Sequence, residues 1–300
     1  MRPLLLSFFV WPYAVFGAAA PIPIHTIRIG LANSRGEITD IKRLEMEKYL
    51  LGVVAREMSP DWPIEALKAQ AVVARTYAYS ELGRFDSDGF DLTSDTRSQI
   101  YDPGPVSDSA RQAVSKTRGE VLGFHGELLG VYYHSCCGGH TTSPKTAWGA
   151  QARSPRPLRG VPDSVCHSSP YMRWTSFFTS KELSGLLGGR RLRGRNVAWV
   201  EVASRDRAGY ATLLKAKIGR ETVRVPGFLL RRELGDKDLP SLKIRRIVKL
   251  KGGFEFQGSG MGHGVGLCQW GAKLLALRGW PYERILKHYF PGAVLSVVVE

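Results

Sequence analysis

The sequence predicts a mixed α+β protein, a single large domain with helices around a groove and an inserted, basic, β-rich lobe. Apolar side chains recur at helical spacing between residues 46 and 82. Short alternating runs, typical of strands, lie among basic clusters between residues 175 and 252. The 33 glycines and 17 prolines among 300 residues indicate many turns, and the hydrophobic content of 43% is that of a folded protein.

The chain is predicted to have four parts. Residues 1–20 form a signal peptide or N-terminal anchor, 27–174 the first part of the core, 175–252 the inserted lobe, and 253–300 the C-terminal part of the core. Residues 1–20 combine an early arginine, a short apolar run and a small-residue end, which is the layout of a secretory signal peptide. No later stretch is apolar enough to span a bilayer, so an uncleaved N-terminal segment is the one membrane contact expected.

The first elements of the core are a strand and a helix. A strand is predicted at residues 27–31. The following helix carries an apolar stripe of Met46, Leu50 and Val53, and it ends at the stop signal of residues 58–60, Met-Ser-Pro. Residues three and four apart share one helix face, so this stripe is expected to pack against the core.

A second helix is predicted to open at Pro63, which suits a first helical turn, and to close near Gly83. Its stripe consists mostly of small side chains and lets another element approach closely. The polar segment 91–99 is predicted to be a loop at the surface or along a cleft. Residues 120–134 form two short strand-like runs around His125-Gly126, a hairpin signal.

The lobe and the C-terminal part follow. In the lobe, strands are predicted at 197–202 and 211–218. The C-terminal part is predicted to contain a glycine-rich loop at 258–266, helices at 267–277 and 282–289, and a closing strand at 294–299.

The charge balance indicates an anionic partner. Forty-two Lys and Arg against 27 Asp and Glu give a formal charge of +15. Such an excess suits nucleic acid, anionic lipid or an acidic polymer. The sequence carries no nucleic-acid-binding motif, so no nucleic-acid partner is predicted.

Glu57 is the candidate acid. It lies on the same helix face as Val53 and Leu50, which places a lone carboxylate on the buried side. Burial disfavours the charged form and can raise a glutamate pKa from about 4.3 towards neutrality, where an acid protonates a leaving group well. The alternative is a solvated glutamate at a helix end, or one paired with Arg56.

The cysteines and histidines offer two alternatives. His134, Cys137 and His140 are spaced by three residues, and Cys166 follows downstream. Imidazole and thiolate are the ligands that zinc prefers, so these four could form a structural zinc site. In an oxidising compartment a disulfide from Cys137 or Cys136 to Cys166 competes with the metal. Apart from this structural zinc, no cofactor is expected.

Two further segments are candidate ligand contacts. The glycine-rich loop leads into His263 and Gln269, and its glycines let the backbone approach a ligand closely. It lacks the Lys and Ser/Thr of a phosphate-binding loop, so a nucleotide role is not predicted. Gln99 and Tyr101 leave the preceding polar loop together, and Trp270 could offer an apolar face to a sugar ring.

Five motifs in order resemble the stage II sporulation protein D/LytB family. They cover the chain from about residue 27 to its end. The motifs are Tyr49–Met58 (YLLGVVAREM), Ala66–Ala78 (ALKAQAVVARTYA), Ser98–Tyr101 (SQIY), His134–Thr141 (HSCCGGHT) and Gly262–Ala272 (GHGVGLCQWGA).

This resemblance implies a peptidoglycan protein of the periplasm or cell wall. Members of the family similar to the sporulation protein are lytic transglycosylases, whose catalytic glutamate occupies the position of Glu57. They cleave the bond between MurNAc and GlcNAc in glycan strands, particularly strands without stem peptides, and leave a 1,6-anhydro end. Other members resemble noncatalytic enhancers of cell-wall amidases, which is the alternative function. Some members bind zinc near the histidine-cysteine motif.

The resemblance also implies a set of saccharide contacts and partners. The partners expected are peptidoglycan glycan strands and a cell-wall amidase, and sporulation of the organism itself is not implied. The residues expected to bind the saccharide in the groove are Lys68, Gln70, Arg75, Gln99, Tyr101, His134, Ser135, His263, Gln269 and Trp270.

Overall fold

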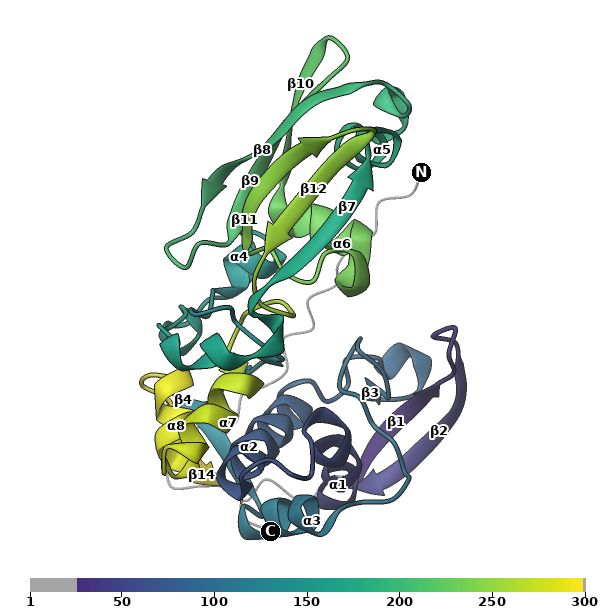
Figure 1. Ribbon diagram of the computed structural model, residues 1–300. Helices are drawn as coiled ribbons and strands as arrows, with labels where there is room; N and C mark the ends of the chain where they lie inside the picture. Colours follow the sequence, from purple (N-terminus) through teal and green to yellow (C-terminus); the bar gives the residue numbers. More distant parts are fainter. Residues whose placement is uncertain (1–25, 299–300) are drawn as a thin grey trace.

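The computed structural model describes residues 26–298, in which eight α-helices and fourteen strands form a mixed α+β fold (Figure 1). The predicted α+β class is therefore confirmed. The predicted signal peptide or anchor at residues 1–20 lies outside the described residues. Within the described part of the chain, no helix is both long and apolar enough to cross a membrane.

The N-terminal sheet leads directly into the first helix. Strand β1 (Thr26–Ala32) pairs with β2 (Ile38–Glu45) antiparallel and with β3 (Leu92–Thr93) parallel. Helix α1 (Met46–Glu57) begins at the residue after β2, and its apolar side faces the core. Strand β3 uses two residues of the segment predicted as a loop at 91–99, because Leu92 is buried beside β1.

Helix α2 (Ile64–Ser80) lies in the centre of the larger body and contacts several other helices. Most of its side chains are buried, and many are Ala or Val, which let neighbours approach closely. Helix α3 (Asp108–Lys116) packs against it and is capped by Ser107, whose hydroxyl accepts from the Ala110 amide.

The C-terminal part returns to this body. The predicted hairpin forms from β4 (Glu120–Phe124) and β5 (Glu127–Leu128), with His125 in the left-handed region at a φ of 54°. The neighbouring elements are β6 (Tyr133–His134), which pairs parallel with β13 (Leu267–Cys268), then α7 (Gln269–Leu277), α8 (Tyr282–Tyr289) and β14 (Val294–Val297), which pairs with β4.

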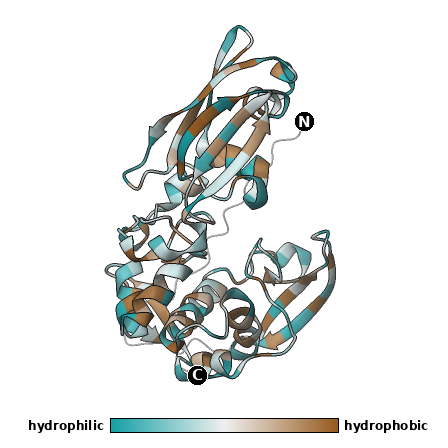
Figure 2. Ribbon diagram, viewed as in Figure 1, coloured by the Kyte–Doolittle hydropathy of each residue, from teal (hydrophilic) through white to brown (hydrophobic). Residues whose placement is uncertain are grey.

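The lobe has two three-stranded sheets and its own hydrophobic core. Figure 1 shows it above the larger body, and in Figure 2 hydrophobic and hydrophilic residues alternate along its strands. The sheets have the orders β10-β9-β8 and β11-β12-β7. The elements are β7 (Trp174–Thr179), α5 (Ser180–Leu192), β8 (Val197–Arg205), β9 (Ala211–Ile218), β10 (Glu221–Pro226), α6 (Gly227–Asp238), β11 (Ile244–Leu250) and β12 (Gly253–Gly258).

Short helices connect the two bodies. Helix α4 (Pro144–Trp148) contacts α6 of the lobe. The 3₁₀ turns η2 (Arg156–Leu158), η3 (Ser164–Ser168) and η4 (Pro170–Met172) follow before β7, whereas η1 (Asp86–Asp88) lies between α2 and β3.

Candidate active site

Glu57 is the last residue of α1, and its side chain meets a strand and a loop. The helix ends there because Met58 is extended, with its N–H bonded to the carbonyl oxygen of Val54. Glu57 Oε1 accepts hydrogen bonds from the Tyr133 hydroxyl at 2.9 Å and from the Ile100 amide at 3.0 Å. The carboxyl group is therefore held by two donors from distant parts of the sequence.

The surroundings raise the pKa of the Glu57 carboxyl above its ordinary value of 4.5. Burial is the largest cause, because it disfavours the charged form. The residue as a whole is half-buried, but its carboxyl group lies among protein atoms. Hydrogen bonds from Tyr133, Ile100 and Gln269 favour the carboxylate without cancelling the effect of burial. A raised pKa keeps the proton on the acid nearer to neutral pH.

The hydrogen-bond chain beyond Tyr133 also suits a protonated acid. The Tyr133 oxygen lies 3.2 Å from Gln99 Oε1 as well as 2.9 Å from Glu57. When Glu57 is ionised, its Oε1 and the Oε1 of Gln99 are both acceptors, and the single hydroxyl hydrogen of Tyr133 can satisfy only one of them. A protonated Glu57 can donate to Tyr133 while Tyr133 donates to Gln99. Gln99 is itself fixed by bonds from its amide to the Tyr49 hydroxyl at 3.2 Å and the Ala74 carbonyl at 3.3 Å.

Two buried side-chain nitrogens near this network have no hydrogen-bond partner within residues 26–298. They are Gln70 Nε2 and His134 Nε2. Gln70 Oε1 accepts from the Gln269 amide at 3.4 Å, and that amide also lies 3.1 Å from the Glu57 carbonyl oxygen. Because buried polar atoms are normally paired, such atoms indicate where a ligand or ordered water binds.

The two histidines of the site are neutral at neutral pH. Burial lowers the pKa of His134 to about 4 and that of His263 well below its ordinary value. Their ring centroids are 5.5 Å apart. His134 Nδ1 lies 3.1 Å from the Val265 carbonyl, which only accepts, so Nδ1 carries the proton and Nε2 is an acceptor. The Trp148 ring lies 5.1 Å from His263 and is 39% exposed.

Comparisons with known proteins place this site in a family. Residues 34–124 match the family model described as stage II sporulation protein. An uncharacterized protein of Brachyspira hyodysenteriae is 35% identical, over 84% of this chain and 67% of its own length. The chain belongs to the stage II sporulation protein D/LytB family.

Two named relatives extend the comparison. The amidase enhancer of Bacillus subtilis is 28% identical over 82% of this chain, which spans 40% of that relative's length. The stage II sporulation protein D of Bacillus subtilis is 25% identical, over 85% of this chain and 76% of its own length. The resemblance indicated by the sequence motifs is thus confirmed at the level of the family.

In this member of the stage II sporulation protein D/LytB family, most of the expected saccharide contacts lie in or beside the Glu57 network. Tyr101 adjoins it as the neighbour of Ile100, and its ring packs 5.4 Å from that of Tyr49. The other five are Gln70, Gln99, His134, His263 and Gln269.

Arg75 lies elsewhere, in the protein interior. Its side chain is fully buried, and its guanidinium bonds both carboxyl oxygens of Glu47, at 2.7 and 2.8 Å. A third bond reaches the carbonyl oxygen of Glu120 at 3.1 Å. This geometry supports a structural role rather than the predicted saccharide contact, because no part of the side chain reaches solvent.

The remaining expected contacts are spread around the body. Lys68 Nζ bonds Glu65 at 2.6 Å. Trp270 packs edge-on against Trp62 with ring centroids 5.3 Å apart, and its amide bonds the Ser135 carbonyl at 3.0 Å. Trp270 and Ser135 therefore join α7 to the segment after β6.

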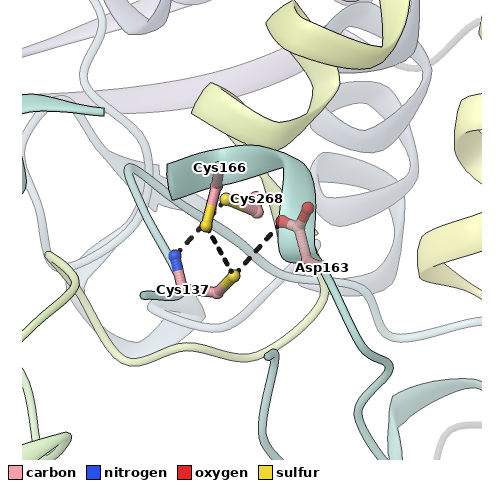
Figure 3. A group of neighbouring side chains, drawn as sticks. All are labelled: Cys137, Asp163, Cys166 and Cys268. Carbon is pink, nitrogen blue, oxygen red and sulfur yellow. Dashed lines mark hydrogen bonds between the residues drawn. The ribbon is translucent and has the colours of Figure 1, made fainter. Parts of the chain in front are cut away.

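The cysteines meet in one buried cluster, but with different partners from those predicted. Cys137, Cys166, Cys268 and Asp163 place one donor atom each within 4.8 Å of one another (Figure 3). His134 and His140 are outside this group, because their Nδ1 atoms face the carbonyls of Val265 and Thr141. The cysteines are free thiols in this structure, so the predicted disulfide is not formed here.

Sequence reasoning missed Tyr133, Asp163 and the role of Cys268. Tyr133 adjoins His134 in a strand, where successive side chains point to opposite faces, so choosing His134 gave no reason to choose its neighbour. Asp163 lies outside the five motifs, and only its distance of three residues from Cys166 could have drawn attention to it.

Two hollows of about 230 and 260 Å³ lie at the surface of the described residues. The first is lined by residues around Asp163 and Trp280, the second by residues around Leu286 and Val294. Neither is lined by a residue of the Glu57 network, so the expected substrate groove stays a prediction. The chemistry of the side chains, rather than the shape of a hollow, identifies the site.

Gly52→Ala is expected to destabilise the protein by about 1–3 kcal/mol, although alanine favours helices. A Cβ at this position of α1 would lie 2.6 Å from the Tyr101 ring and 2.7 Å from the Asp102 carbonyl oxygen. Urea unfolding measures the loss. Gly130→Ala is the control, since a Cβ there meets no atom within 4 Å. Equal stability of the two variants would show that the loop carrying Ile100 and Tyr101 is not packed tightly on α1.

Proposed function

We propose that this protein is a peptidoglycan lytic transglycosylase. It would cleave the bond between MurNAc and GlcNAc in peptide-free glycan strands and form 1,6-anhydroMurNAc. The observation that carries the proposal is the environment of the Glu57 carboxyl group. It accepts hydrogen bonds from Tyr133 and Ile100, and burial raises its pKa. Family membership supports the proposal, because the family model matches residues 34–124, which include Glu57.

The chemistry needs one acid that later becomes a base. Protonated Glu57 gives its proton to the glycosidic oxygen, and the bond from that oxygen to C1 of MurNAc breaks. The C6 hydroxyl oxygen of the same sugar then bonds to C1, and the Glu57 carboxylate takes the hydroxyl proton. The sugar supplies its own nucleophile, so no second carboxylate is required, unlike in ordinary glycoside hydrolysis.

Neighbouring groups support binding of a sugar. His134 Nε2 can accept a hydrogen bond from a sugar hydroxyl, and Gln70 Nε2 can donate one to an acetamido oxygen. Trp148 presents a partly exposed ring beside His263. We further propose that the exposed basic residues of the lobe, such as Arg193, Arg195 and Arg246, contact anionic wall polymer. The proposed location is outside the cytoplasm, in the periplasm or at the wall, with residues 1–20 acting as the export signal.

The test is the product formed from purified, peptide-free glycan strands. Mass spectrometry is expected to find ends that are one water lighter than hydrolysis products. Ends that carry the added water would make the protein a hydrolase instead, and unchanged strands would remove the proposed activity.

A noncatalytic enhancer of a cell-wall amidase is the second candidate, because one relative is named an amidase enhancer. The two are separated by adding an N-acetylmuramoyl-L-alanine amidase and intact peptidoglycan, with and without this protein. Faster release of peptides by both the wild type and Glu57→Gln, with no anhydro ends, would support the enhancer.

A further inference from the structure

We propose that Cys137, Cys166, Cys268 and Asp163 bind a structural zinc ion. Their donor atoms lie within 4.8 Å of one another although they come from three separate segments (Figure 3). In a tetrahedral zinc site with Zn–S bonds of about 2.3 Å, the sulfurs are about 3.8 Å apart. The sulfurs of Cys137 and Cys166 are 3.5 Å apart, close to that spacing.

Backbone amides point at the sulfurs, as a site for thiolates requires. The Gly139 amide donates to Cys166 Sγ at 3.1 Å, and the Cys137 amide donates to Cys268 Sγ at 3.3 Å. The Gly271 amide donates to the same sulfur of Cys268 at 3.3 Å. Hydrogen bonds to the charged form of a group stabilise it, and zinc binds the thiolate rather than the thiol.

Asp163 completes the set of four donors. Its Oδ2 lies 3.2 Å from Cys137 Sγ and accepts a bond from the Tyr289 hydroxyl at 2.9 Å. Its Oδ1 is buried and has no hydrogen-bond partner within residues 26–298. A buried carboxyl oxygen with no partner is costly unless a ligand occupies it, and Tyr289 would orient the carboxylate from the outer shell.

A cation is needed to balance the negative charge of this cluster, and Lys243 of the lobe places a second positive charge nearby. Three thiolates and a carboxylate carry four negative charges, which a buried site cannot hold unpaired. Zinc would neutralise two of them. The ammonium of Lys243 lies 3.5 Å from the Cys137 carbonyl, which also accepts from the Tyr210 hydroxyl at 2.8 Å.

The zinc ion would fix the positions of Tyr133 and Gln269, which both contact Glu57. Cys137 lies four residues after Tyr133, which bonds the Glu57 carboxyl, and Cys268 directly precedes Gln269, which bonds the Glu57 backbone. A metal that joins Cys137 to Cys268 therefore fixes β6 and the start of α7 relative to each other. The site is structural rather than catalytic, because its four protein donors fill a tetrahedral shell.

Elemental analysis of the full chain, purified without chelator, tests the proposal independently of any activity at Glu57. We expect one zinc ion per chain and four cysteines that titrate as thiols after denaturation and metal removal. A chain without metal whose thiol count falls by two would overturn the proposal in favour of a disulfide.

Variants identify the ligands. Cys166→Ser and Cys268→Ser are expected to lose most of the zinc, whereas Cys136→Ser keeps it. Cys136 is equally buried, and its thiol lies against those of Cys166 and Cys268, but it is outside the group of four donors. Cys136→Ser therefore separates a site that uses Asp163 from one that uses all four cysteines. Loss of zinc from Cys136→Ser with retention in Cys268→Ser would contradict the assignment.

Cobalt replacement on the wild type keeps the proposal testable even if a variant fails to fold. Cobalt bound by thiolates gives charge-transfer absorption in the near ultraviolet that grows with the number of thiolate ligands. We expect the intensity of a tetrahedral site with three thiolates. An octahedral spectrum without charge-transfer bands would exclude a thiolate site.

Discussion

Glu57→Gln is expected to slow cleavage of peptide-free glycan strands by about 10²–10⁴-fold, the range that general acid–base catalysis contributes. The amide has nearly the same shape and can still accept hydrogen bonds from Tyr133 and Ile100, but it cannot donate a proton to the glycosidic oxygen. The rate of formation of anhydro ends, measured by mass spectrometry against time, gives the loss. Circular dichroism should show an unchanged fold.

The control for this substitution is Glu81→Gln. Glu81 follows the last residue of α2, and burial likewise raises the pKa of its carboxyl. It pairs with Arg84 and takes no part in the Glu57 network. Its replacement should leave the rate within about twofold of the wild type, since substitutions away from the groups that carry the chemistry have small effects. Equal rates for the wild type and Glu57→Gln would remove Glu57 from catalysis.

Arg75→Met is expected to destabilise the protein by about 3–5 kcal/mol, as does breaking a buried ion pair by removing one partner. The substitution would leave the Glu47 carboxylate and the Glu120 carbonyl without their guanidinium donor. Urea unfolding followed by fluorescence measures the loss.

Arg84→Met, near the end of the same helix, is the matched control for Arg75. The side chain of Arg84 is 43% exposed, and exposed ion pairs contribute about 0–1 kcal/mol. If Arg75→Met kept wild-type stability but bound glycan strands weakly, the saccharide contact expected from the motif would be supported and the structural role would be wrong.

Local patterns in the sequence predicted several elements well. The predicted helix at 282–289 has the bounds of α8, and the stop signal at Met58 ends α1 where expected. The helix predicted from residue 267 begins two residues later, because Leu267 and Cys268 pair with β6. Periodicity predicts a helix but carries no information on a strand partner more than 130 residues away.

The helices of the lobe were not predicted because glycines interrupt them. Gly189 in α5 and Gly235 in α6 have left-handed φ values of 67° and 75°, so the helical pattern breaks inside each element. A capping box between Thr179 and Glu182 marks the start of α5 and was a usable signal.

The site was predictable where a motif carries it and not where the tertiary fold assembles it. Glu57 follows from its helix face and from the family motif. The bond from Tyr133 to Glu57 depends on β6 lying beside the end of α1, which no spacing reveals. The choice among His134, His140 and Asp163 as neighbours of the cysteines likewise depends on distances in the folded chain.

The proposed mechanism requires that the Glu57 carboxyl keep its proton above the pH at which an ordinary glutamate loses it. Carbon NMR of protein labelled at the glutamate carboxyl measures this directly, with Glu57→Gln to identify the signal. We expect a titration midpoint above 4.5, so that the carboxyl stays protonated between 4.5 and that midpoint. A midpoint at or below 4.5 would contradict it, because Glu57 would then be a carboxylate with no proton to give.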